Sequence, residues 1–212
     1  MADADKIPTP AKRAEIASRT VAIDGNELTL ITEGPERLAV LIDLIDGAKH
    51  SLRMLYYIYR GDGAGGLVRE AIERALDRGV DVALLVDGFG FAAPENYFAD
   101  LIAKRMRFCR FHPTFGRRYL IRNHQKLALA DERRVLIGGF NIEDDYFQSE
   151  AQGGWRPIST IFSPGRSSRV PKSARSIALS ICAAKRRGRC NGPSVDRLAG
   201  CRHGPRRPAA IC

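Results

Sequence analysis

The sequence predicts an α/β fold in which a mixed β-sheet is flanked by helices, followed by a disordered basic C-terminal tail. Short β-rich runs alternate with segments of helical periodicity between residues 20 and 156, an order typical of such a sheet. From residue 157 onward Arg, Ser, Pro, Gly and Cys dominate and the apolar periodicity is largely lost. We therefore expect a flexible N-terminus over residues 1–19, one domain over residues 20–156 and a low-structure tail over residues 157–212.

The domain is expected to begin with a β-hairpin and a helix. Residues 20–23 and 27–31 are β-rich and flank residues 24–26, which favour a tight turn. Residues 35–47 begin with proline, end with glycine and carry apolar side chains at helical spacing. Residues 52–59 then form an apolar run, which predicts a buried strand.

The remainder of the domain continues the alternation of helices and strands. Apolar residues at helical spacing predict helices over residues 67–77 and 97–104. Apolar and β-branched runs predict strands over residues 80–86, 107–111, 119–130 and 133–137.

The net positive charge of the chain comes from the tail. The formal net charge is +10, but residues 156–212 hold thirteen Lys or Arg residues against the single acid Asp196. Nucleic acid is therefore a possible partner only non-specifically and through the tail, in a salt-dependent way. No apolar run approaches the roughly 20 residues of a membrane span, so we expect a cytoplasmic protein or one peripheral to the inner face of a bacterial membrane.

One glycine-rich loop imitates a dinucleotide-binding motif. Gly61, Gly63 and Gly66 match G-x-G-x-x-G between a predicted strand and a predicted helix. Against that reading, Asp62 lies inside the loop, where it would repel a pyrophosphate, and a hairpin and a helix precede the supposed first strand. We therefore disfavour a dinucleotide site.

A more specific pattern follows residue 123. It reads H-x-K-x-x-x-x-D at His124, Lys126 and Asp131, and it continues with G-G-x-N at residues 138–141. Residues two apart on a strand point to the same face, so the His124 and Lys126 side chains are expected side by side. A histidine can attack phosphorus while a neighbouring ammonium binds the non-bridging oxygens, and neither step needs a metal ion or a cofactor.

The other residues of the pattern fit the same chemistry. Asn141 could donate a hydrogen bond to a phosphate, while Gly138 and Gly139 would let the backbone approach a ligand closely. Asp131 is expected either to orient the site or to cap the turn of a hairpin. A surface histidine and lysine on an ordinary strand would explain H-x-K alone, but they would not explain the whole string.

At these residues the chain resembles the phospholipase D superfamily. Residues 32–45, the strand that ends at residues 55–57, and residues 109–139 further resemble the N-terminal half of bacterial cardiolipin synthase-like proteins. The resemblance implies a phosphatidyltransferase or phosphodiesterase that forms a phosphohistidine and passes the phosphatidyl group to water or to an alcohol. It implies a phospholipid substrate such as phosphatidylglycerol, met at a membrane surface, and it does not settle whether His124 is the nucleophile or the general acid and base.

The chain differs from this family because it carries a single H-x-K-x-x-x-x-D motif. Family members build one active site from two such motifs, in one chain or one from each subunit of a dimer. The only histidine after His124 is His203, which lacks a lysine two residues on. The single chain is therefore expected to be incomplete, and the alternatives are a homodimeric one-motif phosphodiesterase or nuclease and a catalytically inactive, truncated product.

The tail has two interpretations. Dropping the first two bases of the Pro157 codon and choosing allowed codons yields D-L-H-H-L-L-A-G-P-L-V-A-S, which resembles the W-R-D-x-H and G-P that cardiolipin synthase-like proteins show after their first motif. We therefore hypothesise that residues 157–212 are read in a shifted frame. The rival interpretation is a basic arm that binds nucleic acid or anionic lipid.

Overall fold

The computed structural model describes residues 20–23, 26–111, 124–155 and 159–164. Its helices are α2 (Gly34–Asp46), α3 (Gly63–Asp77) and α4 (Ala99–Ala103), with the 3-10 turns η3 (Asp144–Tyr146) and η4 (Glu150–Gln152). Its strands are β1 (Thr20–Ile23), β2 (Asn26–Ile31), β3 (Ser51–Tyr56), β4 (Tyr59–Arg60), β5 (Asp81–Asp87), β6 (Phe91–Ala92), β7 (Arg107–Phe111), β8 (Leu127–Ala130), β9 (Arg134–Gly138) and β10 (Ser159–Pro164).

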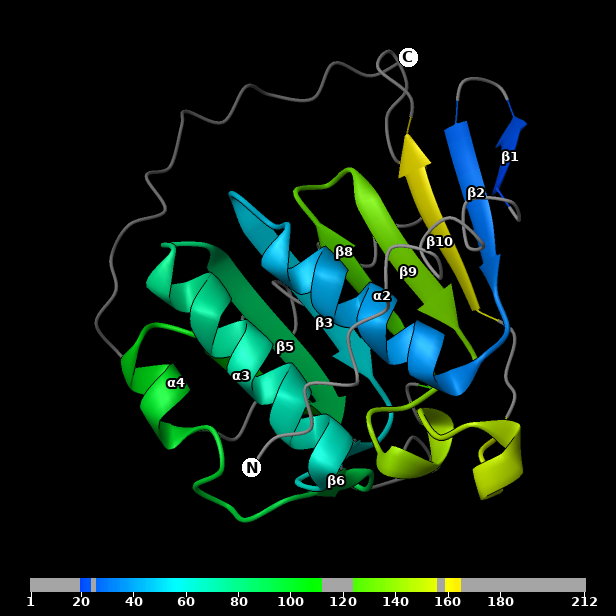
Figure 1. Ribbon diagram of the computed structural model, residues 1–212. Coiled ribbons are helices and arrows are strands. Elements are labelled where there is room, and N and C mark those ends of the chain that lie inside the picture. Colours follow the sequence, from blue (N-terminus) through cyan, green and yellow to red (C-terminus); the bar gives the residue numbers. More distant parts are fainter. Residues whose placement is uncertain (1–19, 24–25, 112–123, 156–158, 165–212) are drawn as a thin grey trace, which may run out of the picture.

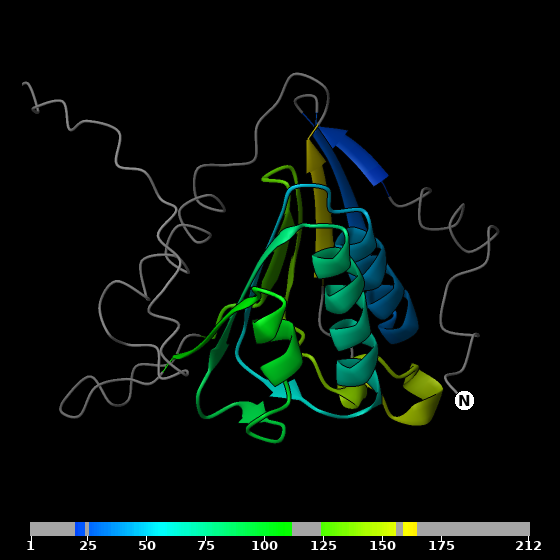
Figure 2. The ribbon, with the colours of Figure 1, turned by 90° about the vertical axis from the view of Figure 1, so that its left-hand side faces the viewer.

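The main sheet is mixed, as predicted. Its eight strands follow the order β1-β2-β10-β9-β8-β3-β5-β7, in which β3, β5 and β7 are parallel and the other pairs are antiparallel. Helices α2 and α3 lie side by side across one face of this sheet (Figures 1 and 2). The predicted fold class, a mixed sheet flanked by helices, is confirmed.

The larger core lies between the sheet and these two helices. Side chains at helical spacing on α2 and α3 bury their apolar atoms against alternate residues of the strands, and each fully buried Leu or Ile contributes about 1.5–3 kcal/mol. The fully buried members include Leu41, Leu44, Ile72, Leu52 and Met54. A second, smaller cluster is formed by the alternate side chains of β3, β5 and β8, and it includes Leu55, Leu85, Leu127 and Leu129.

Helix α3 begins four residues before its predicted start, inside the glycine-rich loop. Asp62 is its N-cap, and its carboxylate accepts a hydrogen bond from the backbone N–H of Gly65 at 3.0 Å. The Cβ of any other residue at position 65 would lie well inside van der Waals contact with the carbonyl oxygen of Arg60, whereas Gly66 has open space. The loop therefore requires glycine at position 65 because the start of α3 packs closely on Arg60, and not because a pyrophosphate needs room.

The described part of the tail differs from the expectation of low structure. Ser159–Pro164 form β10, which pairs with β2 on one side and with β9 on the other. The boundary of the sheet therefore lies beyond residue 157, because pairing on both sides recruits a segment whose composition did not predict it. The predicted flexible segment 1–19 and residues 165–212 of the predicted tail lie outside the described residues.

The remaining differences concern the ends of elements. The predicted helix 97–104 is shortened to α4, and the predicted strand 119–130 is a strand only from Leu127, with residues 119–123 outside the described ranges. The predicted strand 107–111 is confirmed as β7. Within the described ranges, no helix is both long enough and apolar enough to span a membrane.

Candidate functional site

The candidate site forms where β8 begins and β3 ends. The two strands are antiparallel, and Leu127 at the start of β8 pairs with Leu55 near the end of β3. His124 and Lys126, which precede β8, therefore lie beside Tyr57, which follows β3. The backbone N–H of Gly138 donates to the carbonyl oxygen of Lys126 at 3.4 Å, so the end of β9 joins the same place.

The side chains of His124 and Lys126 meet, as the spacing predicted. The Lys126 Nζ lies 3.0 Å from the Nδ1 of His124 and donates to the carbonyl oxygen of His124 at 2.8 Å. Residues 124–126 are not part of a strand, so this contact comes from the approach to β8 and from the lysine folding back on the histidine. An ammonium group has donors only, so the Nδ1 of His124 accepts from it and the proton of a neutral imidazole then lies on Nε2.

The two residues of this pair differ in solvent exposure. His124 is exposed, whereas Lys126 is only 6% exposed. Burial lowers the pKa of Lys126, because a charged ammonium loses hydration inside the protein. A phosphate that reached His124 would thus meet a cation whose charge is poorly solvated and available for pairing.

Asn141 is held at the same place by both ends of its amide. Its Oδ1 accepts from the backbone N–H of Ile58 at 3.1 Å, and its Nδ2 donates to the Tyr146 hydroxyl at 3.1 Å. It is 2% exposed, so its remaining N–H is fixed in direction. The backbone around it pairs with the segment that follows β3, because the N–H of Ile142 donates to the carbonyl oxygen of Ile58 and the N–H of Arg60 donates to that of Ile142.

A buried arginine supports this loop from helix α2. The guanidinium of Arg37 donates to the carbonyl oxygens of Tyr146 and Thr32 and lies 5.6 Å from the ring centroid of Phe140. Burial lowers the pKa of Arg37 to about 10, although the nearby carboxylates Glu33 and Glu36 act in the opposite direction. Helix α2 thereby fixes the loop that carries Asn141.

Two aspartates join the same loop to the start of α3. Asp62 accepts from the backbone N–H of Asp144 at 2.9 Å, and Asp144 accepts from the backbone N–H of Ala64 at 2.7 Å. Carboxylates at a helix N-terminus interact favourably with the helix dipole. This reciprocal capping gives Asp62 a structural role, and it occupies the helix terminus at which a dinucleotide phosphate would have to bind.

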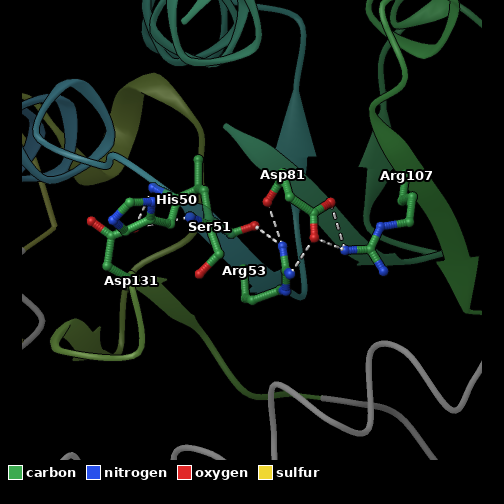
Figure 3. A network of polar contacts seen from close by, with 7 residues as sticks. His50, Ser51, Arg53, Asp81, Arg107 and Asp131 are labelled. Atoms are coloured by element: carbon green, nitrogen blue, oxygen red, sulfur yellow. Dashed lines mark hydrogen bonds and ion pairs between the residues drawn. The ribbon is translucent and has the colours of Figure 1, made fainter. Parts of the chain in front are cut away.

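Asp131 lies at the opposite end of β8. Its carboxylate accepts from the backbone N–H groups of Lys49, His50 and Ser51 at 2.7–2.9 Å (Figure 3). It lies five positions after Lys126, a distance of roughly 16 Å along an extended strand. The structure therefore brings His124, Lys126 and Asn141 toward one place and does not bring Asp131 there.

Asp131 lies in the tight turn between β8 and β9, where its carboxylate can accept hydrogen bonds from the backbone before β3. Asp131 and Glu132 both have φ of 54°, the left-handed region found in tight hairpin turns. Burial alone would raise the pKa of Asp131, but the hydrogen bonds from the Ser51, Lys49 and His50 N–H groups lower it overall. Beside it, Arg53 and Arg107 pair with Asp81, so charged groups hold the amino ends of β3, β5 and β7 together (Figure 3).

Sequence reasoning missed three supporting residues: Tyr57, Tyr146 and Arg37. Tyr57 contacts the imidazole of His124, with ring centroids 4.8 Å apart. Its position near the carboxyl end of the predicted buried strand 52–59 was a usable signal, because ligands often bind beyond the carboxyl ends of strands. Arg37 gave no such signal, since a charged residue in an amphipathic helix is normally exposed.

The described histidines do not form a pair. His50 lies before β3, beside Asp131, and His124 lies at the other end of that strand. His112 and His203 lie outside the described residues. Within the described ranges, His124 therefore has no second imidazole beside it.

The fold defines a class of protein, the α/β domains built on a mixed sheet with helices packed on it, and the histidine–lysine pair lies directly before strand β8. A family model described as "Cardiolipin synthase, PLD-like domain" matches residues 41–152, just over half of the chain. The chain belongs to this family. It is 34% identical over 137 residues to a cardiolipin synthase of Listeria monocytogenes and 31% identical over 140 residues to one of Clostridium perfringens.

These matches cover part of each protein. The aligned segments take up 62% and 64% of this chain but only 28% and 29% of the two cardiolipin synthases. The chain therefore spans less than a third of the length of the relatives it matches.

Solved structures share the fold. NucT from Helicobacter pylori aligns with a TM-score of 0.57 and 15% identity, over 74% of this chain and 96% of that chain. Nuc from Salmonella typhimurium, a phospholipase D family member, aligns with a TM-score of 0.53 and 19% identity, over 78% and 97%. A phosphatidylserine synthase from Haemophilus influenzae gives 0.55 and 15% identity, over 84% of this chain but 48% of that one.

Proposed function

We propose that this chain is the phosphate-binding half of a phospholipase D-type phosphatidyltransferase or phosphodiesterase, related in activity to cardiolipin synthases. The observation that carries the proposal is the 3.0 Å contact between the Lys126 Nζ and the His124 Nδ1. It places a buried cation against an exposed imidazole, which suits attack on an anionic phosphodiester. The names of the relatives favour a phospholipid such as phosphatidylglycerol as the substrate, bound at a membrane surface.

In the proposed reaction an imidazole nitrogen of His124 attacks phosphorus. A non-bridging phosphate oxygen takes over the ammonium of Lys126, which releases Nδ1 and lets the imidazole proton move there, leaving Nε2 free to attack. The P–N bond forms while the bond from phosphorus to the leaving alcohol breaks. Asn141, with Gly138 and Gly139, is proposed to contribute donors around the phosphate oxygens.

The leaving alcohol needs a proton, which the attacking imidazole cannot supply at the same time. A second acid must donate it and then, as a base, activate the water or alcohol that cleaves the phosphohistidine. Within the described ranges no second histidine lies near His124. We therefore propose that the site is completed by a second motif, supplied by another copy of the chain or by a partner half-domain.

For Asp131 we propose a supporting role at the turn between β8 and β9. Its three N–H partners hold the chain that leads into β3, the strand that carries Tyr57 at its far end. It would thus support the site through the geometry of β3 and β8, without contact with the substrate.

The test uses the purified chain and its His124→Ala and Lys126→Met variants with labelled phosphatidylglycerol. We expect an acid-sensitive, base-stable adduct in the unaltered chain that both variants lack, with products analysed in parallel. A folded sample without adduct or turnover would rule out completion of the site by a second copy of the chain, and normal adduct formation in the His124→Ala variant would contradict the proposal. Removing the nucleophile and removing the cation should both abolish the adduct.

The second candidate is a homodimeric phosphodiesterase that uses one motif from each subunit. It is favoured by the length of the alignments, which cover 96% and 97% of the NucT and Nuc chains. A two-fold axis would bring two His124 residues together. Light scattering at several concentrations, combined with hydrolysis of bis(p-nitrophenyl) phosphate, separates the candidates: a dimer that hydrolyses this diester but not phosphatidylglycerol supports the second.

A further inference from the structure

The aromatic ring of Tyr57 contacts both members of the histidine–lysine pair. Its centroid lies 4.8 Å from that of the His124 imidazole, with the planes inclined by 50°. The Lys126 Nζ lies 5.4 Å from the same centroid, within the range of a cation–π interaction. One half-buried side chain therefore links the two groups to which the proposed chemistry is assigned.

The backbone of Tyr57 is fixed on two sides. A Cβ at Gly90 would fall well inside van der Waals contact with the Tyr57 carbonyl oxygen, so the loop after β5 packs directly on this residue. The next residue, Ile58, donates its N–H to Asn141. The backbone that carries the ring is therefore held by the end of β3, by the β5 loop and by the loop that carries Asn141.

The partners of Lys126 among the described residues are a carbonyl oxygen, an imidazole nitrogen and an aromatic ring. Its Nζ contacts the carbonyl oxygen and Nδ1 of His124 and the Tyr57 ring, and no carboxylate pairs with it in the described part of the chain. A carboxylate would neutralise the ammonium and repel an incoming phosphate. An aromatic face instead attracts the cation through its quadrupole and adds no net charge.

We propose that Tyr57 is a positioning residue that holds Lys126 and His124 in place for a phosphate anion without neutralising the lysine. The proposal rests on the proposed function for its catalytic meaning and extends it to a residue outside the H-x-K-x-x-x-x-D pattern. All the contacts that carry it involve the ring and none involves the hydroxyl. Phenylalanine should therefore replace tyrosine at this position, and leucine should not.

The test compares Tyr57→Phe and Tyr57→Leu in the full chain, with inorganic phosphate as the probe. In the unaltered chain we expect NOEs between the Tyr57 ring and the His124 imidazole protons, together with a ring-current shift of those protons. Tyr57→Leu should abolish the shift and weaken phosphate binding by about two- to fivefold. Tyr57→Phe should keep both the shift and the affinity.

Tyr97→Leu is the matched control. Tyr97 is also partly buried and packs against Phe98, but its ring contacts are with other residues than His124 and Lys126. It should lose stability without changing the His124 signals or the affinity for phosphate. A general loosening of the fold would affect this variant as well.

The outcomes separate this inference from the proposed function. Absent NOEs in the unaltered chain, a Tyr57→Leu variant that binds phosphate normally, or a Tyr57→Phe variant that fails to restore binding would each overturn the role of Tyr57. The NOE measurement needs no variant and holds even if Tyr57→Leu does not fold. If the ring signature and its rescue are found but no phosphohistidine forms, Tyr57 positions the pair for anion binding and only the proposed reaction fails.

Discussion

Replacing Asp131 by alanine tests whether this residue of the pattern acts through the fold or at the chemistry. The substitution leaves three backbone N–H groups, those of Lys49, His50 and Ser51, without their carboxylate. A hydrogen bond to a charged group contributes about 1.5–3 kcal/mol. Two of the three lie at the surface, where water replaces the carboxylate, so we expect a total loss of about 2–3 kcal/mol.

The loss should appear as a lower melting temperature. For a domain of this size it corresponds to about 5–10 °C in thermal unfolding followed by circular dichroism. Asp131→Asn, which keeps one acceptor oxygen, should fall between alanine and the unaltered chain. Below its melting temperature, Asp131→Ala should bind inorganic phosphate at His124 with unchanged affinity.

The pH dependence gives a second readout. Since the pKa of Asp131 is lowered in the folded protein, its contribution to stability is present above the unfolded value near 4 and is lost as the pH falls through the folded value. The difference in stability between the unaltered chain and Asp131→Ala should therefore shrink below about pH 4. A variant of normal stability that no longer binds phosphate would refute the structural role and return Asp131 to the site.

Four further substitutions have expected outcomes. Lys126→Met should raise the unfolding free energy by about 1 kcal/mol in denaturant titrations, because burial disfavours the ammonium, while phosphate binding disappears. Gly65→Ala should destabilise the fold by more than about 2 kcal/mol through its collision with the Arg60 carbonyl, whereas Gly66→Ala should be neutral or stabilising by up to about 1 kcal/mol in thermal unfolding; equal effects would contradict the packing argument. Tyr56→Phe should stabilise the fold by about 1 kcal/mol, since the buried Tyr56 hydroxyl has no hydrogen-bond partner in the described ranges, and a loss of stability would show that a partner was overlooked.

Local patterns were sufficient to predict most of the sheet and its helices. The hairpin of β1 and β2 follows from turn residues between two short β-rich runs, and α2 follows from a proline, a glycine and apolar side chains at helical spacing. These signals lie within a few residues of the element they define. The local signal for β10 is short and lies in a segment rich in Arg, Ser and Pro, and its pairing with β2 and β9 comes from segments more than twenty residues away.

The sequence pattern predicted the histidine and the lysine of the site, but not the residues that support them. The spacing predicted that His124 and Lys126 lie close together, but their contact forms ahead of β8, where the lysine folds back on the histidine, and the strand pattern does not predict that geometry. Tyr57 and Arg37 join the site only through tertiary packing, one from the end of β3 and one from the buried side of α2. Their roles depend on distances that no local pattern encodes.

The position of β10 bears on the reading-frame hypothesis. The sheet needs a strand between β2 and β9, since both would otherwise present unpaired N–H and C=O groups at new edges. Both frames supply one: Ser159–Pro164 contains the β-favouring residues Thr160, Ile161 and Phe162, and the alternative frame places H-L-L-A at the same point. A strand here is therefore compatible with either frame, and the coding DNA decides between them. The hypothesis predicts a second H-x-K-x-x-x-x-D in the shifted frame downstream of the Pro157 codon, and its absence from all downstream frames would leave the basic arm as the better account of the tail.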